Sequence, residues 1–187
     1  MDKLTVLKAH WEKSKLSPVF YHTTFMENVL SILKDQKIVA NKGKSICKTN
    51  NGIVSLSDRI NKGIVEFFGN VVFEFDAIML FNKNRSIIPK IYGSLTNINK
   101  LYDERPLFEN EWSVPNKLKF NIKDISKILL ITSIGFREPS FKGLANTLFR
   151  KNIPFSFLHE RWLSDKMVTD MTSYLLRIRG WRRFMKY

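Results

Sequence analysis

Three short polar clusters interrupt the apolar pattern of the chain and hold the residue types that could do chemistry. They are Tyr21-His22-Thr23-Thr24, Ser55-Leu56-Ser57-Asp58-Arg59 and Glu109-Asn110-Glu111-Trp112. Imidazole, hydroxyl and carboxylate groups are the usual side chains of acid–base and hydrogen-bonding sites. The first cluster lies directly before a predicted helix, the second closes a predicted strand, and the third ends a long loop that leads into the strand predicted at Leu118. At such places a rigid element can hold an exposed side chain.

Each cluster also has a purely structural explanation. A histidine before a helix more often makes a structural hydrogen bond, and Ser55 and Ser57 alternate with apolar residues as on the polar face of a half-buried strand. Glu109 and Glu111 fit a solvated loop edge. No cluster is therefore specific by itself.

The elements that must position these clusters follow from local patterns. Thr24 and Glu27 have the spacing of a capping box, which predicts a helix over Phe25–Gln36. Further strands are predicted at Ile38–Ala40, Ile53–Ser57, Val71–Phe75, Leu118–Ile125, Ile128–Ile134 and Phe155–His159. A helix capped by Ser140 and ending at Arg150, and a last helix from Ser164, complete the pattern, whereas Asn82–Asn110 is long and poor in pattern. The mixed order predicts an α+β fold with a mainly antiparallel sheet.

Charge is the unusual feature of the composition. The 187 residues contain 31 Lys and Arg against 17 Asp and Glu, a net charge of +14. This surplus favours a polyanionic partner, although solubility alone also explains it. The single cysteine, Cys47, indicates a reducing compartment, and no cysteine–histidine pair has zinc spacing, so we expect no metal. The longest uncharged apolar run, Ile128–Ile134, is too short to cross a membrane, so we expect a cytoplasmic protein with no membrane partner.

Two basic regions are candidates for nucleic-acid binding. In the last thirteen residues arginines alternate with aromatic side chains, as in surfaces that bind phosphates and stack on unpaired bases. The alternative is that the aromatic residues there join the core and the arginines are solvated, and binding to an anionic lipid surface ranks third. The candidate nucleic-acid-binding residues are Arg177, Arg179, Arg182, Arg183, Lys42, Lys44 and Lys48.

The order of the three polar clusters resembles the ADP-ribosyltransferase family. An aromatic-His-Thr segment before a helix, a Ser-x-Ser strand and a Glu-x-Glu entering a later strand are most similar to bacterial and phage members with a histidine-serine-glutamate triad, which include the DNA ADP-ribosyltransferase toxins. The resemblance spans Val19 to Ile134 and implies a single domain, 1–187, with a split sheet and flanking helices. We expect residues 19–134 to form its core, and residues 139–187, mostly beyond the resemblance, to form a C-terminal helix-strand-helix extension with a basic tail.

The resemblance implies NAD as substrate and a role for each cluster. Glu111 is the implied catalytic carboxylate, and the preceding Glu109 assists the acceptor. The implied NAD-binding residues are His22 through a ribose hydroxyl, Thr23 through its backbone N–H, Tyr21 through its ring, Ser55 and Ser57 beside the carboxylate, and Arg59 at the pyrophosphate. Many relatives have a glycine after the histidine where this chain has Thr23. No glycine-rich dinucleotide motif is present either.

Two functions from different classes follow. The first is an NAD-dependent mono-ADP-ribosyltransferase that modifies nucleic acid or a nucleic-acid-associated protein, in a bacterial host cytoplasm or a phage particle. The alternative is a basic nucleic-acid-binding or structural protein, also compatible with a phage, that carries a non-catalytic version of the fold. A nuclease is disfavoured because no set of metal-binding carboxylates is clustered in the sequence.

Overall fold

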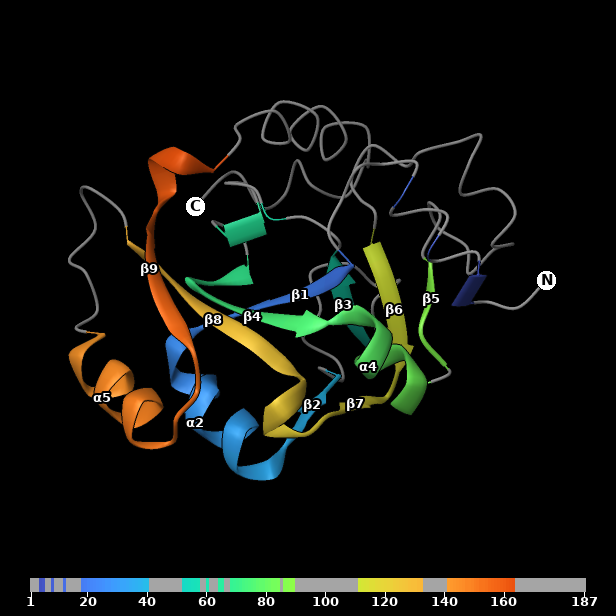
Figure 1. Cartoon of the computed structure of the whole chain (residues 1–187), viewed down its shortest axis with the longest axis horizontal. Coiled ribbons are helices and arrows are strands. Elements are labelled where there is room, and N and C mark those ends of the chain that lie inside the picture. The colour runs from blue at the N-terminus through green and yellow to red at the C-terminus, as the bar shows by residue number, and fades with distance from the viewer. Residues whose placement is uncertain are drawn as a thin grey trace, which may run out of the picture.

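A seven-stranded sheet forms the centre of the fold (Figure 1). The computed structural model describes residues 4–5, 8, 12, 18–40, 52–57, 60, 64–65, 68–84, 86–89, 111–132 and 141–163. The strand order is β5-β6-β3-β1-β4-β8-β9, and every neighbouring pair is antiparallel except β8 and β9, which are parallel. The strands are β1 Val19–Thr24, β3 Ile53–Ser57, β4 Val71–Asp76, β5 Ile88–Pro89, β6 Glu111–Pro115, β8 Ile125–Thr132 and β9 Phe155–His159.

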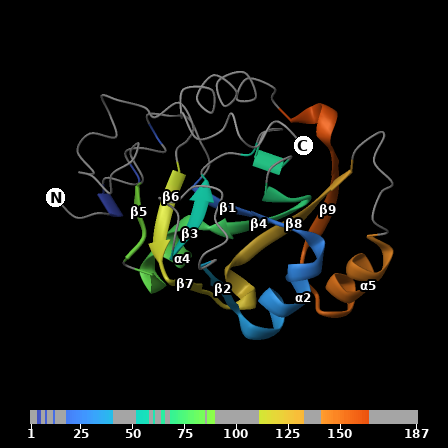
Figure 2. The same ribbon diagram turned by 180° about the vertical axis from the view of Figure 1, so that it is seen from behind.

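Three helices pack into the main hydrophobic core, and two further strands form a separate small sheet. The helices are α2 Met26–Asp35, α4 Ala77–Lys83 and α5 Lys142–Arg150, and the small sheet pairs β2 Lys37–Val39 with β7 Lys117–Lys119. Apolar residues of all three helices belong to one buried cluster with Phe20, Phe73 and Phe75 of the large sheet. Seen from both sides, α2 and α5 lie next to each other along the sheet (Figures 1 and 2).

The predicted fold class is confirmed: the protein is α+β, with a mostly antiparallel sheet and flanking helices. The strands predicted at Ile53–Ser57 and Phe155–His159 have the predicted bounds. A second, smaller hydrophobic cluster contains Val72, Leu129 and Ile131, with Tyr21 packed against it. Alternate residues of β4 and β8 thus fill two clusters, which explains why these strands are apolar along most of their length.

The predicted capping box at the start of α2 is wrong. The N-cap is Phe25, and it makes no side-chain cap hydrogen bond. Thr24 is still part of β1, where it pairs with Val71, and its hydroxyl accepts a hydrogen bond from the Asn28 amide at 3.2 Å. Strand pairing therefore fixes Thr24 in an extended backbone one residue too early to cap the helix.

The strand predicted over Leu118–Ile125 is also wrong. β7 ends at Lys119, a 3-10 turn spans Ile122–Asp124, and β8 begins at Ile125. A reciprocal capping box between Asn121 and Asp124 closes this turn and interrupts the apparent alternation.

Three elements, α4, β5 and β6, were not predicted. Helix α4 follows β4 directly, and the Asp76 carboxylate caps it by accepting from the Met79 amide at 2.8 Å. Strand β6 begins at Glu111, and β5 lies within the region predicted to lack pattern. The helix predicted to end at Arg150 is α5, but its N-cap is Phe141 rather than Ser140.

An ion pair between the partly exposed Lys83 and the buried Asp124 fixes the turn before β8 against α4. The Asp124 side chain is fully buried and accepts hydrogen bonds from the Lys83 ammonium, at 2.6 Å for one carboxylate oxygen. Asn84, the residue after Lys83, donates from its side-chain amide to the carbonyl oxygens of Leu80 and Lys119. Its amide oxygen accepts from the backbone N–H of Lys119. These contacts join α4 to β7 and β8 on the same side of the sheet.

Within the described ranges, no helix is both long and apolar enough to span a bilayer. The same part of the chain contains no group of three or more His, Cys, Asp and Glu residues arranged to hold a metal ion. The last predicted helix lies outside the described residues, and so do several predicted site residues: Arg59, Glu109, Lys42, Lys44, Lys48, Arg177, Arg179, Arg182 and Arg183.

Candidate active site

The three polar clusters meet across three adjacent strands. Tyr21 of β1 lies opposite Ser57 of β3, and Ser57 lies opposite Glu111 of β6. One backbone position from each cluster therefore falls in a single row across the sheet, although 36 and 54 residues separate them along the chain (57 − 21 and 111 − 57). Residues directly opposite in antiparallel strands have Cβ atoms about 5 Å apart, so this row is compact.

His22 lies at the seam between β1 and β3. Its Nδ1 is 3.0 Å from the backbone carbonyl oxygen of Ser55. A carbonyl oxygen only accepts, so Nδ1 carries the hydrogen, and in the neutral ring Nε2 is left with a lone pair. The first polar cluster is thus held to the second by a contact between a side chain and the backbone.

The imidazole is held in its neutral form. Burial lowers the pKa of His22 from its ordinary value of 6.5, and the hydrogen bond to Ser55 opposes that effect only in part. At neutral pH the ring therefore donates through Nδ1 and accepts through Nε2. A neutral acceptor of this kind suits a hydroxyl group of a ligand.

The pH dependence of stability should show this buried imidazole. The unfolded chain takes up a proton near pH 6.5 while the folded chain resists it, so the free energy of unfolding should fall as the pH drops below about 6.5. Asparagine does not titrate, so we expect His22→Asn to lose this part of the pH dependence. The slopes of the free energy of unfolding against pH should differ between wild type and variant by at most about 1.4 kcal/mol per pH unit. Urea unfolding of both proteins between pH 7.5 and 5 measures the difference. Parallel curves would show that His22 does not titrate differently on folding.

The strands that carry the site are anchored by large apolar residues. His22 pairs with Phe73 of β4, which is fully buried in the main core. Trp112 follows Glu111 directly, is fully buried, and its ring centroid lies 5.3 Å from that of Phe20. Because both neighbouring residues are packed in the core, the backbone at His22 and Glu111 has little freedom to shift.

Residues with hydroxyl groups occur on all three strands of the site, β1, β3 and β6. Thr23, Ser55 and Ser57 are half-buried, and Ser55 lies opposite Ser113 of β6. Ser113 is 1% exposed, and its hydroxyl has no hydrogen-bond partner among the described residues. Ser113 was not predicted as a site residue, although its place two residues after Glu111 puts it on the same face of a strand as that residue.

The structure brings some of the predicted site residues into direct contact and places others only in a shared backbone row. His22 and Ser55 are in contact, and Tyr21, Ser57 and Glu111 share a backbone row. The Tyr21 side chain packs against the second hydrophobic cluster and is partly buried there.

No protein-family model matches the chain, and no curated protein matches it in sequence. Among solved structures, the chain is similar to DarT of Thermus sp. 2.9, whose structure was determined in complex with ADP-ribosylated single-stranded DNA. The two chains are 11% identical, with a TM-score of 0.46, and the similarity covers 79% of this chain and 96% of that one.

Proposed function

We propose that the protein is an NAD-dependent mono-ADP-ribosyltransferase that acts on nucleic acid or on a nucleic-acid-associated protein in the cytoplasm. The strongest support is the shared row of Tyr21, Ser57 and Glu111, together with the contact between His22 and Ser55. The three polar clusters that resemble the family in their order thus come from three adjacent strands.

The proposed chemistry is cleavage of the bond between nicotinamide and its ribose, with transfer of ADP-ribose to an acceptor through the same ribose carbon. Positive charge develops on the sugar as nicotinamide leaves, as in glycoside hydrolysis. The Glu111 carboxylate stabilises this charge through the neighbouring ribose hydroxyl, and Ser55 and Ser57 orient the carboxylate. Nicotinamide departs with the bonding electrons, and the acceptor releases its proton to water as it bonds the ribose carbon.

The remaining residues bind NAD or the acceptor. The Nε2 lone pair of His22 accepts from a ribose hydroxyl, and the Thr23 backbone N–H donates to the nicotinamide amide. Tyr21 offers aromatic surface near this group. Arg59 binds the pyrophosphate through its planar guanidinium, and Glu109 assists the acceptor.

Exposed lysines support an anionic target. On the small sheet, Lys37 of β2 lies directly opposite Lys119 of β7, and Lys117 is the next exposed residue on the same strand. Like charges placed directly opposite each other destabilise a sheet. Lys37 has Asp35 at 3.6 Å, but neither Lys117 nor Lys119 forms an ion pair with a described carboxylate. A polyanion bound at this face would relieve the repulsion.

A transfer assay tests the proposal. The protein is incubated with NAD labelled on the adenylate phosphate and, in separate reactions, with single-stranded DNA, duplex DNA, RNA or cell extract. We expect release of nicotinamide together with label that becomes attached to the acceptor. Nuclease or protease digestion then identifies the class of acceptor. Absence of both nicotinamide release and transfer from every acceptor would favour the alternative, a nucleic-acid-binding protein with a non-catalytic version of the fold.

A further inference from the structure

An exposed aromatic surface lies at the end of the sheet farthest from β5, where β9 forms the edge. Phe149 of α5 is 75% exposed and Phe157 of β9 is 57% exposed. The rings of Phe155 and Phe157 are in edge-on contact at 6.1 Å between centroids. Single exposed aromatic residues are ordinary on protein surfaces, but a group of them is a binding feature. We call Phe149, Phe155 and Phe157 the aromatic edge.

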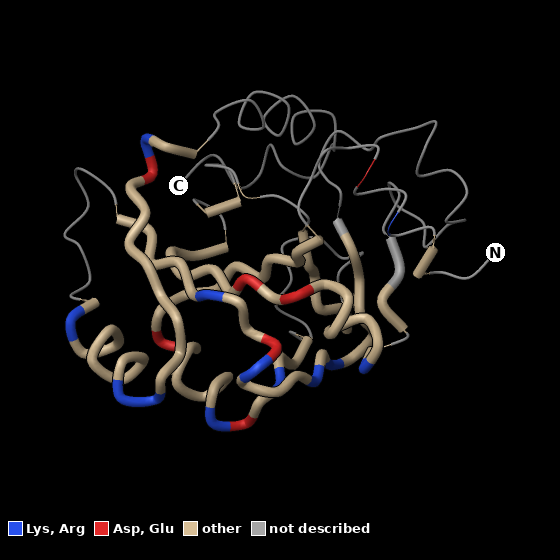
Figure 3. The backbone as a smooth tube through the Cα atoms, viewed as in Figure 1, with Lys and Arg blue, Asp and Glu red and all other residues tan. Residues whose placement is uncertain are grey.

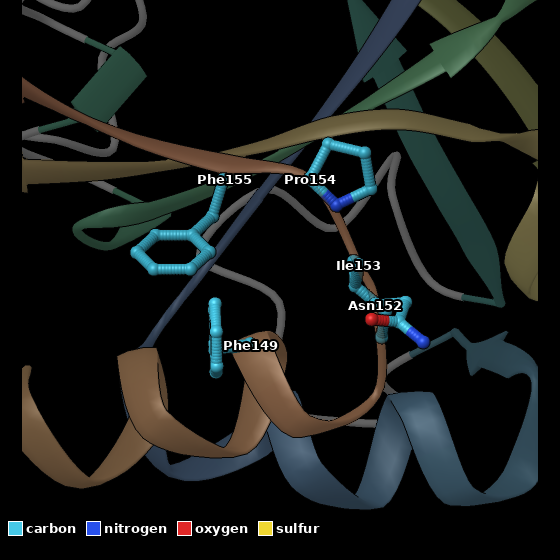
Figure 4. Close-up of a pocket in the computed structure, with 5 residues that line it drawn as sticks. All are labelled: Phe149, Asn152, Ile153, Pro154 and Phe155. Atoms are coloured by element: carbon cyan, nitrogen blue, oxygen red, sulfur yellow. The ribbon is translucent and has the colours of Figure 1, made fainter.

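An open pocket of about 330 Å³ lies within the aromatic edge. It is lined by Phe149, Asn152, Ile153, Pro154 and Phe155 (Figure 4). Figure 4 shows the Phe149 side chain rising from α5 toward the Phe155 ring, with the Asn152 amide to one side. Asn152 has a positive φ of 51°, a conformation that asparagine tolerates well. The pocket thus offers aromatic faces beside a group that both donates and accepts hydrogen bonds.

Every charged side chain in the segment that lines the pocket is cationic. Residues 141–159 contain Lys142, Arg150 and Lys151 and no Asp or Glu. None of these cations forms an ion pair with a described carboxylate, and Arg150 and Lys151 directly follow Phe149. In Figure 3 the helix that corresponds to α5 is blue at both ends and carries no red. The pocket is therefore suited to an apolar, planar group carried on an anionic chain.

We propose that the aromatic edge binds single-stranded nucleic acid, with an unpaired base stacked on Phe149 and the phosphates beside Arg150 and Lys151. Stacking on aromatic side chains next to cations is the usual way in which proteins bind single strands. The bases of a duplex are already stacked and cannot enter the pocket. β4 and β8 separate this surface from β1. The inference goes beyond the proposed function, because binding here requires no NAD.

The test measures binding of a fluorescein-labelled 15-nucleotide oligothymidylate by anisotropy, without NAD. We expect Phe149→Ala to weaken binding about tenfold and Phe149→Tyr, which keeps an aromatic face, to bind like the wild type. Leu30→Ala, which removes another exposed apolar side chain, from α2, is the matched control and should have no effect. Arg150→Gln should reduce the dependence of affinity on salt, which Phe149→Ala should leave unchanged.

Three results would overturn this proposal. The first is equal affinity of the wild type and Phe149→Ala, and the second is equal affinity for the single strand and its duplex, which would indicate phosphate contacts alone. The third is a wild-type dimer that Phe149→Ala dissociates in the absence of nucleic acid, because the aromatic edge would then be a self-association interface. Since NAD is absent from every measurement, failure of the transfer assay has no bearing on these outcomes.

Discussion

Glu111→Gln should lower the rate of nicotinamide release by about 100- to 1,000-fold. Glutamine has nearly the shape of glutamate but no negative charge, so it cannot stabilise the positive charge that develops on the ribose. Since Glu111 lies at the start of β6, beside Ser57, the exchange leaves the strand register intact. The rate is measured by chromatography of nicotinamide at saturating NAD.

Two further variants make the Glu111 result interpretable. Glu27→Gln changes an exposed glutamate in the first turn of α2 and should retain the wild-type rate. Glu109→Gln should reduce transfer to the acceptor more than it reduces nicotinamide release, because Glu109 is assigned to the acceptor. Equal rates for wild type and Glu111→Gln would remove the carboxylate from the mechanism, whatever other activity the protein has.

Gly69→Ala should destabilise the protein by about 3 kcal/mol or more. Gly69 has a φ of +119°, which side chains of L-residues rarely adopt, and a Cβ atom here would lie 2.3 Å from the backbone carbon and oxygen of Thr24. Backbone atoms cannot rotate away, so the end of β1 would have to move. Because Thr24 is two residues from His22, we also expect weaker NAD binding than in the wild type.

The matched control for this prediction is Gly143→Ala. Gly143 lies in α5 with open space around the position of a Cβ atom, and alanine is the better helix former. We expect this variant to be as stable as the wild type or up to about 1 kcal/mol more stable. Urea unfolding at pH 7.5 compares the two variants. A Gly69→Ala protein as stable as Gly143→Ala would show that β1 adjusts without cost.

Much of the fold is predictable from local patterns, because strands such as β3 and β9 are short, apolar and bounded by turn residues. The error at Thr24 arises because a tertiary contact overrides a local signal. Thr24 has the right spacing to cap α2, but its pairing with Val71 keeps it in β1. Helix α4 was not predicted, because a short, mostly apolar segment directly after a strand is compatible both with a helix and with a continuation of that strand.

The sequence predicts which residue types belong to the candidate site, but it does not predict the contacts between them. The sequence shows which clusters are polar, but the row through Ser57 and Glu111 depends on the register of β6, a strand that was not predicted. The partner of His22 is the carbonyl group of Ser55. Every residue but proline has both backbone groups, so no side-chain pattern reveals such a bond.

The large sheet is joined unevenly at its middle. β1 pairs with β4 over six positions and β3 with β6 over five, whereas the described pairing between β1 and β3 is limited to Tyr21 and Ser57. The hydrogen bond from the His22 imidazole to Ser55 therefore adds a side-chain link between β1 and β3, where the backbone pairing is short. A ligand that contacted both β1 and β3 would hold the two parts of the sheet together. Its binding would therefore raise the free energy of unfolding of the whole domain.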